Sequence, residues 1–180
     1  MKKFIASILL IAGAIAAPAA RAQNTFDDHI HLWEVIQQTG IQTSVNTISC
    51  NGGDDGAYYS YAGLLVVCQD AARFNVGKQV EWSENDLDTL RHEAHHIVQD
   101  CNNGVLGDGL FNRLFVEKDE LYKFISSSGM SLDDIRNWAM AYTKQGLPQE
   151  QFLEEMEAVA VAYSVDARSI ADKIEKFCTY

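Results

Sequence analysis

The chain has few basic residues, few prolines and only one long apolar run. Lysine and arginine together number 14, against 25 aspartates and glutamates, and the formal net charge is −11. An acidic surface repels phosphate backbones and anionic lipids, so nucleic acids and membrane surfaces are poor candidates as partners. The two prolines leave no proline-rich linker between domains. No second run is apolar and long enough to cross a bilayer.

The first 22 residues have the pattern of a secretory signal peptide. Two lysines precede an apolar run, Phe4–Ala17, and Ala20-Arg21-Ala22 is a typical cleavage sequence. A retained membrane anchor is the alternative, but the apolar run is shorter than the ~20 residues that span a bilayer. We therefore expect cleavage after Ala22, which leaves residues 23–180 as one secreted or periplasmic domain.

The four cysteines include no CxxC pair, which argues against a cysteine zinc cluster. An even number of cysteines in an exported chain predicts disulfides, here two, with three possible pairings. Cys50 and Cys68 lie in stretches that we expect to form neighbouring strands, so we favour a bridge between them. Elimination then pairs Cys101 with Cys178.

The hydrophobic pattern predicts an α+β fold, in which a small antiparallel sheet precedes a mostly helical part. A first helix is expected between Thr25 and Gly40. Residues 41–50 and 62–69 are rich in valine and isoleucine and are predicted strands joined by a loop. The second could be an edge strand that pairs with a peptide, or an ordinary core strand. From Ser83 onward the pattern is helical almost to the end.

The segment "LRHEAHHIVQDC" is predicted to lie on one of these helices. Its apolar face consists of Leu87, Leu90, Ala94, Ile97, Val98 and Cys101. His92, His96 and Gln99 project from the opposite face, so two imidazoles one turn apart can bind one metal ion. Glu93 lies at the side where a water on that ion would sit. His95 points about 60° away and is expected to support a ligand or line a cleft.

His92-Glu93-Ala94-His95-His96 matches the HExxH pattern, and the chain therefore resembles the zincin metallopeptidases. The resemblance implies a Zn²⁺ cofactor held by His92 and His96. It also implies that Glu93 is the general base in the hydrolysis of a peptide or protein substrate. The resemblance covers this helix, a later one and the preceding strand, and the closest likeness is to small secreted HExxH proteins.

The third metal ligand distinguishes the branches of the zincins. Gln99 and Asn102 stand where the metzincin motif has glycine and histidine, so that branch is excluded. The gluzincin branch takes a glutamate from a later helix, and the segment Glu155–Ala162 resembles that helix. Gluzincins often carry aspartate or asparagine four residues after the ligand, where this chain has Val159.

Glu154, Glu155 and Glu157 compete for the role of third ligand. The apolar face of their helix consists of Phe152, Met156, Val159 and Tyr163. We expect this face to pack on the motif helix. Glu155 lies about 70° from its centre, Glu157 about 130° and Glu154 about 170°. Only Glu155 is therefore expected to reach inward to the metal.

The sequence thus predicts a secreted or periplasmic zinc metallopeptidase of the gluzincin type. The alternative is a non-catalytic, disulfide-linked binding or inhibitory domain with a structural zinc or no metal. Glu93 favours the enzyme, because a structural zinc site needs no base. Tyr142 and Tyr163 are candidates for stabilising an oxyanion, although either could be a packed tyrosine. We also expect His29 and His31 to lie at the surface or in a helix cap. Asp100 is expected either to orient a ligand or to face solvent.

Overall fold

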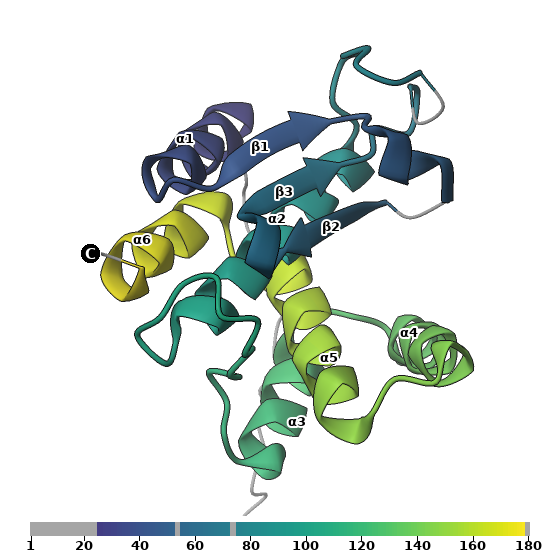
Figure 1. The fold of residues 1–180 in the computed structure, drawn as a ribbon. Coiled ribbons are helices and arrows are strands. Elements are labelled where there is room, and N and C mark those ends of the chain that lie inside the picture. The colour runs from purple at the N-terminus through teal and green to yellow at the C-terminus, as the bar shows by residue number, and fades with distance from the viewer. Residues whose placement is uncertain (1–24, 53–54, 73–74, 179–180) are drawn as a thin grey trace, which may run out of the picture.

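The computed structural model describes residues 25–52, 55–72 and 75–178. The predicted signal peptide, residues 1–22, lies outside them. In chain order the helices and strands are α1 (Phe26–Gln38), β1 (Gln42–Val45), β2 (Gly56–Tyr59), β3 (Leu64–Val67), α2 (Glu84–Cys101), α3 (Lys118–Ser127), α4 (Leu132–Gln145), α5 (Gln149–Ser164) and α6 (Ala167–Phe177). The sheet lies with α1, α2 and α6 in one half of the molecule, and α3 and α4 lie in the other (Figure 1). The predicted α+β fold is confirmed.

Three helices begin immediately after a residue whose side chain caps the helix. Thr25, Ser83 and Ser131 each accept a hydrogen bond from the backbone N–H three residues later, where an aspartate side chain accepts from the cap residue in return. Such reciprocal bonds satisfy N–H groups that have no partner within the helix. Gly146 ends α4 in the left-handed conformation, with φ of 75°. At these ends the helix boundaries follow from local chemistry.

The sheet is mixed, with the strand order β1-β3-β2. The two strands predicted from the sequence, β1 and β3, were expected to be antiparallel but run parallel, and β2 is the strand that runs antiparallel to β3. Parallel neighbours need a long crossover connection, and the segment between β1 and β3 provides it and contains β2. From the sequence, the residues of β2 were expected to belong to the loop between the two predicted strands. Because β3 is central, it is a core strand, and the two edges are β1 and β2.

Two hydrophobic cores meet along α5. The first joins the sheet with α1, α2 and α6, and Val161 of α5 contributes to it. The second joins α3, α4 and α5 through residues that include Leu153, Met156 and Val159. The prediction that the apolar face of α5 packs on α2 is therefore wrong, because that face packs on α3 and α4. The side of α5 that meets α2 carries small and polar residues instead.

Polar contacts bring α2 and α5 close together. Arg91 is buried, and its Nε and Nη2 donate to the carbonyl oxygen of Ala162 at 3.0 and 2.8 Å. Its Nη1 lies 2.6 Å from Nε2 of His29, whose Nδ1 lies 2.8 Å from the Thr25 carbonyl oxygen. His29 is thus buried at a helix junction. Of the two positions expected for it, the surface is wrong, whereas its ring does contact the N-cap residue of α1, Thr25.

Both predicted disulfides are confirmed. Cys50–Cys68 joins the segment after β1 to the end of β3, and Cys101–Cys178 joins the end of α2 to the end of α6. Within the described residues, no helix is long and apolar enough to cross a membrane.

Removing either disulfide should destabilise the protein, and the loss should be larger for the disulfide that closes the longer loop. The sequence separations are 77 residues for Cys101–Cys178 and 18 for Cys50–Cys68. Loop entropy predicts losses in the free energy of unfolding of about 4.5 and about 3 kcal/mol for the paired Cys→Ala variants. Urea unfolding of both double variants measures the difference. Greater destabilisation from the loss of Cys50–Cys68, which closes the shorter loop, would contradict this expectation.

Candidate metal centre

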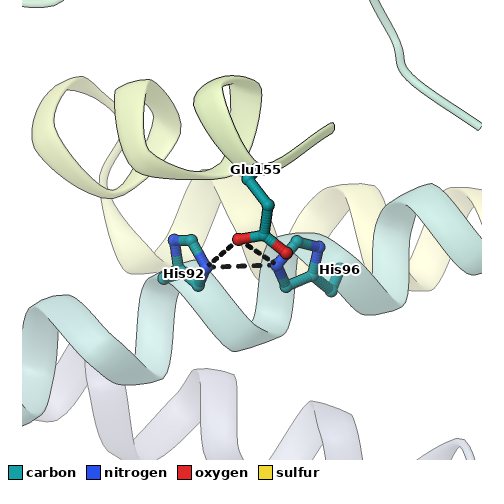
Figure 2. A group of neighbouring side chains, drawn as sticks. All are labelled: His92, His96 and Glu155. Carbon is teal, nitrogen blue, oxygen red and sulfur yellow. Dashed lines mark hydrogen bonds and ion pairs between the residues drawn. The ribbon is translucent and has the colours of Figure 1, made fainter. Parts of the chain in front are cut away.

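Three side chains from two helices meet at one point beside α2. Nε2 of His92 lies 3.1 Å from Nε2 of His96. Oε2 of Glu155, from α5, lies 3.3 Å from the first nitrogen and 3.5 Å from the second. Figure 2 shows Glu155 extending from α5 toward the two imidazoles on α2. The structure therefore brings together the three residues that sequence analysis selected as ligands.

The spacing of these three atoms suits a tetrahedral ion. Two ligand atoms that each lie about 2.0–2.1 Å from a tetrahedrally coordinated zinc are about 3.3 Å apart. The three measured separations lie within 0.2 Å of that value. Two imidazole nitrogens and a carboxylate oxygen are also donors that zinc prefers. The residues present therefore fit Zn²⁺.

The cluster attracts positive charge. Burial lowers the pKa of His96, but hydrogen bonding and charge from Glu155 outweigh it and raise that pKa to about 9. Burial acts to raise the pKa of Glu155, yet the hydrogen bonds from His92 and His96 hold it well below the ordinary value. Glu155 is thus ionised and holds a proton on its histidine neighbour, at the place where a metal ion would bind.

Glu93 lies next to the cluster and belongs to the same cleft. Its side chain is almost buried, and burial raises its pKa above the ordinary value for glutamate. Strand β2 presses against α2 here: a Cβ on Gly56 would lie 2.6 Å from Cγ2 of Thr89 and 3.2 Å from Cγ of Glu93. Only glycine permits this approach, so Gly56 brings the edge strand next to Glu93.

A cleft of about 540 Å³ opens over the cluster. Asp55 and β2 line one side, and the other side contains Trp138 and Tyr142 of α4 and Tyr163 of α5. Burial and the charge of Glu155, to which Tyr142 is hydrogen bonded, raise the pKa of Tyr142. Its hydroxyl therefore remains protonated and can donate a hydrogen bond.

The position of Glu157 differs from the one expected from its angle around the axis of α5. It is fully buried, whereas Glu154 and Glu155 are partly exposed. The projection assumed one buried face, but α5 is covered by α2 and by the segment before α3 as well as by α3 and α4. Glu157 therefore faces inward, on a different side of α5 from Glu155.

His95 and Asp100, also on α2, lie outside the three-residue cluster. His95 is buried and contacts Glu157, so it neither joins the three-residue cluster nor lines the cleft. Asp100 is fully buried too, and its Oδ2 accepts hydrogen bonds from Tyr58, Ser60 and the N–H of Gly107. It neither faces solvent nor contacts a histidine of the cluster.

Gln99 is the supporting residue that sequence analysis missed. Its Oε1 lies 2.7 Å from Nδ1 of His96. In the sequence, Gln99 lies on the same helical face as His92 and His96, where it also departs from the metzincin motif. The spacing of three residues between His96 and Gln99 is the signal that could have identified this contact.

The fold and the cluster together define a small α+β protein with a candidate metal centre formed by two histidines and a carboxylate. The chain matches the family described as Domain of unknown function (DUF8637) over residues 24–179, and it belongs to that family. Neither the curated proteins nor the solved structures contained a match to the chain.

Zinc binding to the cluster should depend on pH. A proton and a metal ion compete for Nε2 of His96, whose pKa is raised to about 9. Below that pH the ion must displace the proton, so we expect affinity to fall about tenfold per pH unit as acidity increases. Competition against a chelator of known proton affinity measures the trend. Affinity that stays constant from alkaline to neutral pH would contradict binding at His96.

Proposed function

We propose that the protein is a zinc-dependent metallopeptidase that acts on peptide or protein substrates outside the cytoplasm. The single observation that carries the proposal is the convergence of His92, His96 and Glu155 in a cleft, with Glu93 beside them. The two disulfides support an exported location, because disulfides persist in oxidising compartments.

In the proposed mechanism, three residues bind the metal ion and a fourth acts as the general base. His92, His96 and Glu155 would hold Zn²⁺, which when bound supplies a Lewis acid that polarises a carbonyl group and activates water. Glu93 would accept the proton of the attacking water on its carboxylate and pass it to the leaving amine. Burial raises the pKa of Glu93, which suits a group that must first take up this proton and then release it.

The walls of the cleft suit an extended peptide. Strand β2 is an edge strand, and its residues line the cleft next to Glu93. An extended segment could pair with the backbone of β2 and pass over the cluster. Strand β3, for which the sequence left both an edge and a core position open, is central and cannot pair with a peptide in this way. Tyr142 and Tyr163 line the opposite wall, and the hydroxyl of Tyr142, which bonds to Glu155, could donate to a developing oxyanion only by leaving that carboxylate.

The non-catalytic alternative explains the histidines less well. A structural zinc site is normally closed by four protein ligands. Here three candidate ligands meet in an open cleft, and the fourth nearby group is a buried glutamate whose raised pKa suits a base. This arrangement favours an enzyme over a binding domain.

Replacing the base should separate metal binding from catalysis. We expect Glu93→Gln to retain zinc and to lose at least ~100-fold of its activity, because the amide cannot accept the proton. Metal content and the rate of cleavage of a denatured protein substrate are the two measurements. Glu154→Gln, which changes another carboxylate of the same cleft, is the matched control and should remain active. Full activity in Glu93→Gln would contradict the mechanism.

Replacing the third ligand should remove the metal. We expect Glu155→Ala to weaken zinc binding by more than ~100-fold, beyond the effect typical of a supporting residue. Glu154→Ala, at the adjacent position, should bind zinc as the wild type does. Zinc titration of both variants against a fluorescent chelator provides the comparison. Equal affinities would show that Glu155 is not a ligand.

A further inference from the structure

A second cluster of polar side chains lies at the crossing of α2 and α5, on the buried side. Glu157 of α5 accepts hydrogen bonds from Nε2 of His95 at 2.9 Å and Nε2 of Gln99 at 3.2 Å. The backbone N–H groups of Leu114 and Phe115 add two more, each at 3.0 Å. His95, Gln99 and Glu157 are all fully buried.

The chemistry of Glu157 decides where His95 carries its proton. Both carboxylate oxygens of Glu157 accept hydrogen bonds from backbone N–H groups, Oε1 from Leu114 and Oε2 from Phe115, as expected for the ionised group. An ionised carboxylate can only accept hydrogen bonds. His95 must therefore donate from Nε2. Its Nδ1 has no hydrogen-bond partner within the described part of the chain, as expected for the unprotonated nitrogen.

The orientation of the Gln99 amide is determined in the same way. Its Nε2 lies 3.0 Å from the carbonyl oxygen of Glu154 and 3.2 Å from Oε1 of Glu157. Both partners are acceptors only, so the NH₂ end of the amide must face them. The amide oxygen then faces His96, and Nδ1 of His96 must donate the 2.7 Å hydrogen bond. In neutral His96, Nε2 is therefore unprotonated and carries a lone pair.

We propose that Gln99 is the positioning residue of the metal centre: it holds the proton of His96 on Nδ1 and so directs the Nε2 lone pair toward His92 and Glu155. Through Glu157, the two adjacent histidines receive opposite tautomers. His95 is protonated on Nε2 and serves the buried cluster, whereas His96 is protonated on Nδ1 and serves the metal. This inference rests on the proposed zinc site and not on peptidase activity.

The variant that tests the role is Gln99→Met, which keeps the length of the side chain and removes the amide. We expect zinc to bind about 10–100-fold more weakly, the usual effect of losing the partner that orients a metal-binding histidine. The hydrogen-bonded Nδ1–H signal of His96 should also disappear from proton NMR spectra. Unchanged zinc affinity together with an unchanged Nδ1–H signal would overturn the proposal.

The matched control is Asp100→Asn, one residue further along α2. Asp100 is equally buried and bonds to Tyr58, Ser60 and Gly107. This variant should lower the melting temperature but leave zinc affinity within about twofold of the wild type, since the cluster keeps its partners. If Asp100→Asn weakens zinc binding as much as Gln99→Met does, the effect of Gln99 is general destabilisation and the proposal fails.

The wild-type protein provides a test that needs no variant. Nitrogen-15 spectra of the histidine rings, recorded in the metal-free protein above the pKa of about 9 of His96, should show His95 protonated on Nε2 and His96 on Nδ1. The reverse assignment for His96 would overturn the proposal even if Gln99→Met does not fold. A wild type that binds zinc but cleaves no peptide would contradict only the peptidase proposal. A wild type that binds no zinc would overturn both.

Discussion

The buried charge of Glu157 is the constraint on which the arrangement of the site depends. An ionised carboxylate in a protein interior is costly unless donors surround it. Here the donors come from α2 and from the segment that precedes α3, so satisfying one charge holds three parts of the chain together. Because Glu155 lies only two residues earlier on α5, the same crossing places its carboxylate beside His92 and His96. The hydrogen bonds of the buried cluster need no metal ion.

The position of α5 between two cores accounts for the cleft. One face of α5, from Phe152 to Tyr163, packs with α3 and α4, and Val161 packs with the sheet, α1, α2 and α6. The cleft lies where the two halves face each other, with β2 on one wall and α4 on the other. Cys101–Cys178 ties the end of α2 to α6 within the first half. The candidate ligands His92 and His96 thus come from α2, in the first half, and Glu155 comes from α5, which packs in both cores.

One departure from the gluzincin pattern has a structural counterpart. Val159 belongs to the core with α3 and α4 and cannot orient a histidine. Gln99, on the motif helix itself, contacts His96 instead and connects it to Glu157. In this chain, the position three residues after the second histidine of HExxH therefore provides a contact to the candidate site that the motif itself does not include.

By itself, the sequence determined the features that depend on neighbours along the chain. Capping pairs such as Ser83 with Asp86 set where helices begin, and helical periodicity placed His92, His96 and Gln99 on one face. Only the tertiary structure decided the strand order and the direction of each glutamate of α5. Burial of a helix on several sides depends on segments far away in sequence, and no periodicity within α5 records them. Glu155 was selected from the sequence on the premise that the apolar face of α5 packs on α2, which the structure contradicts. The inward position of Glu157 and its bond to Gln99 could not be predicted from the sequence.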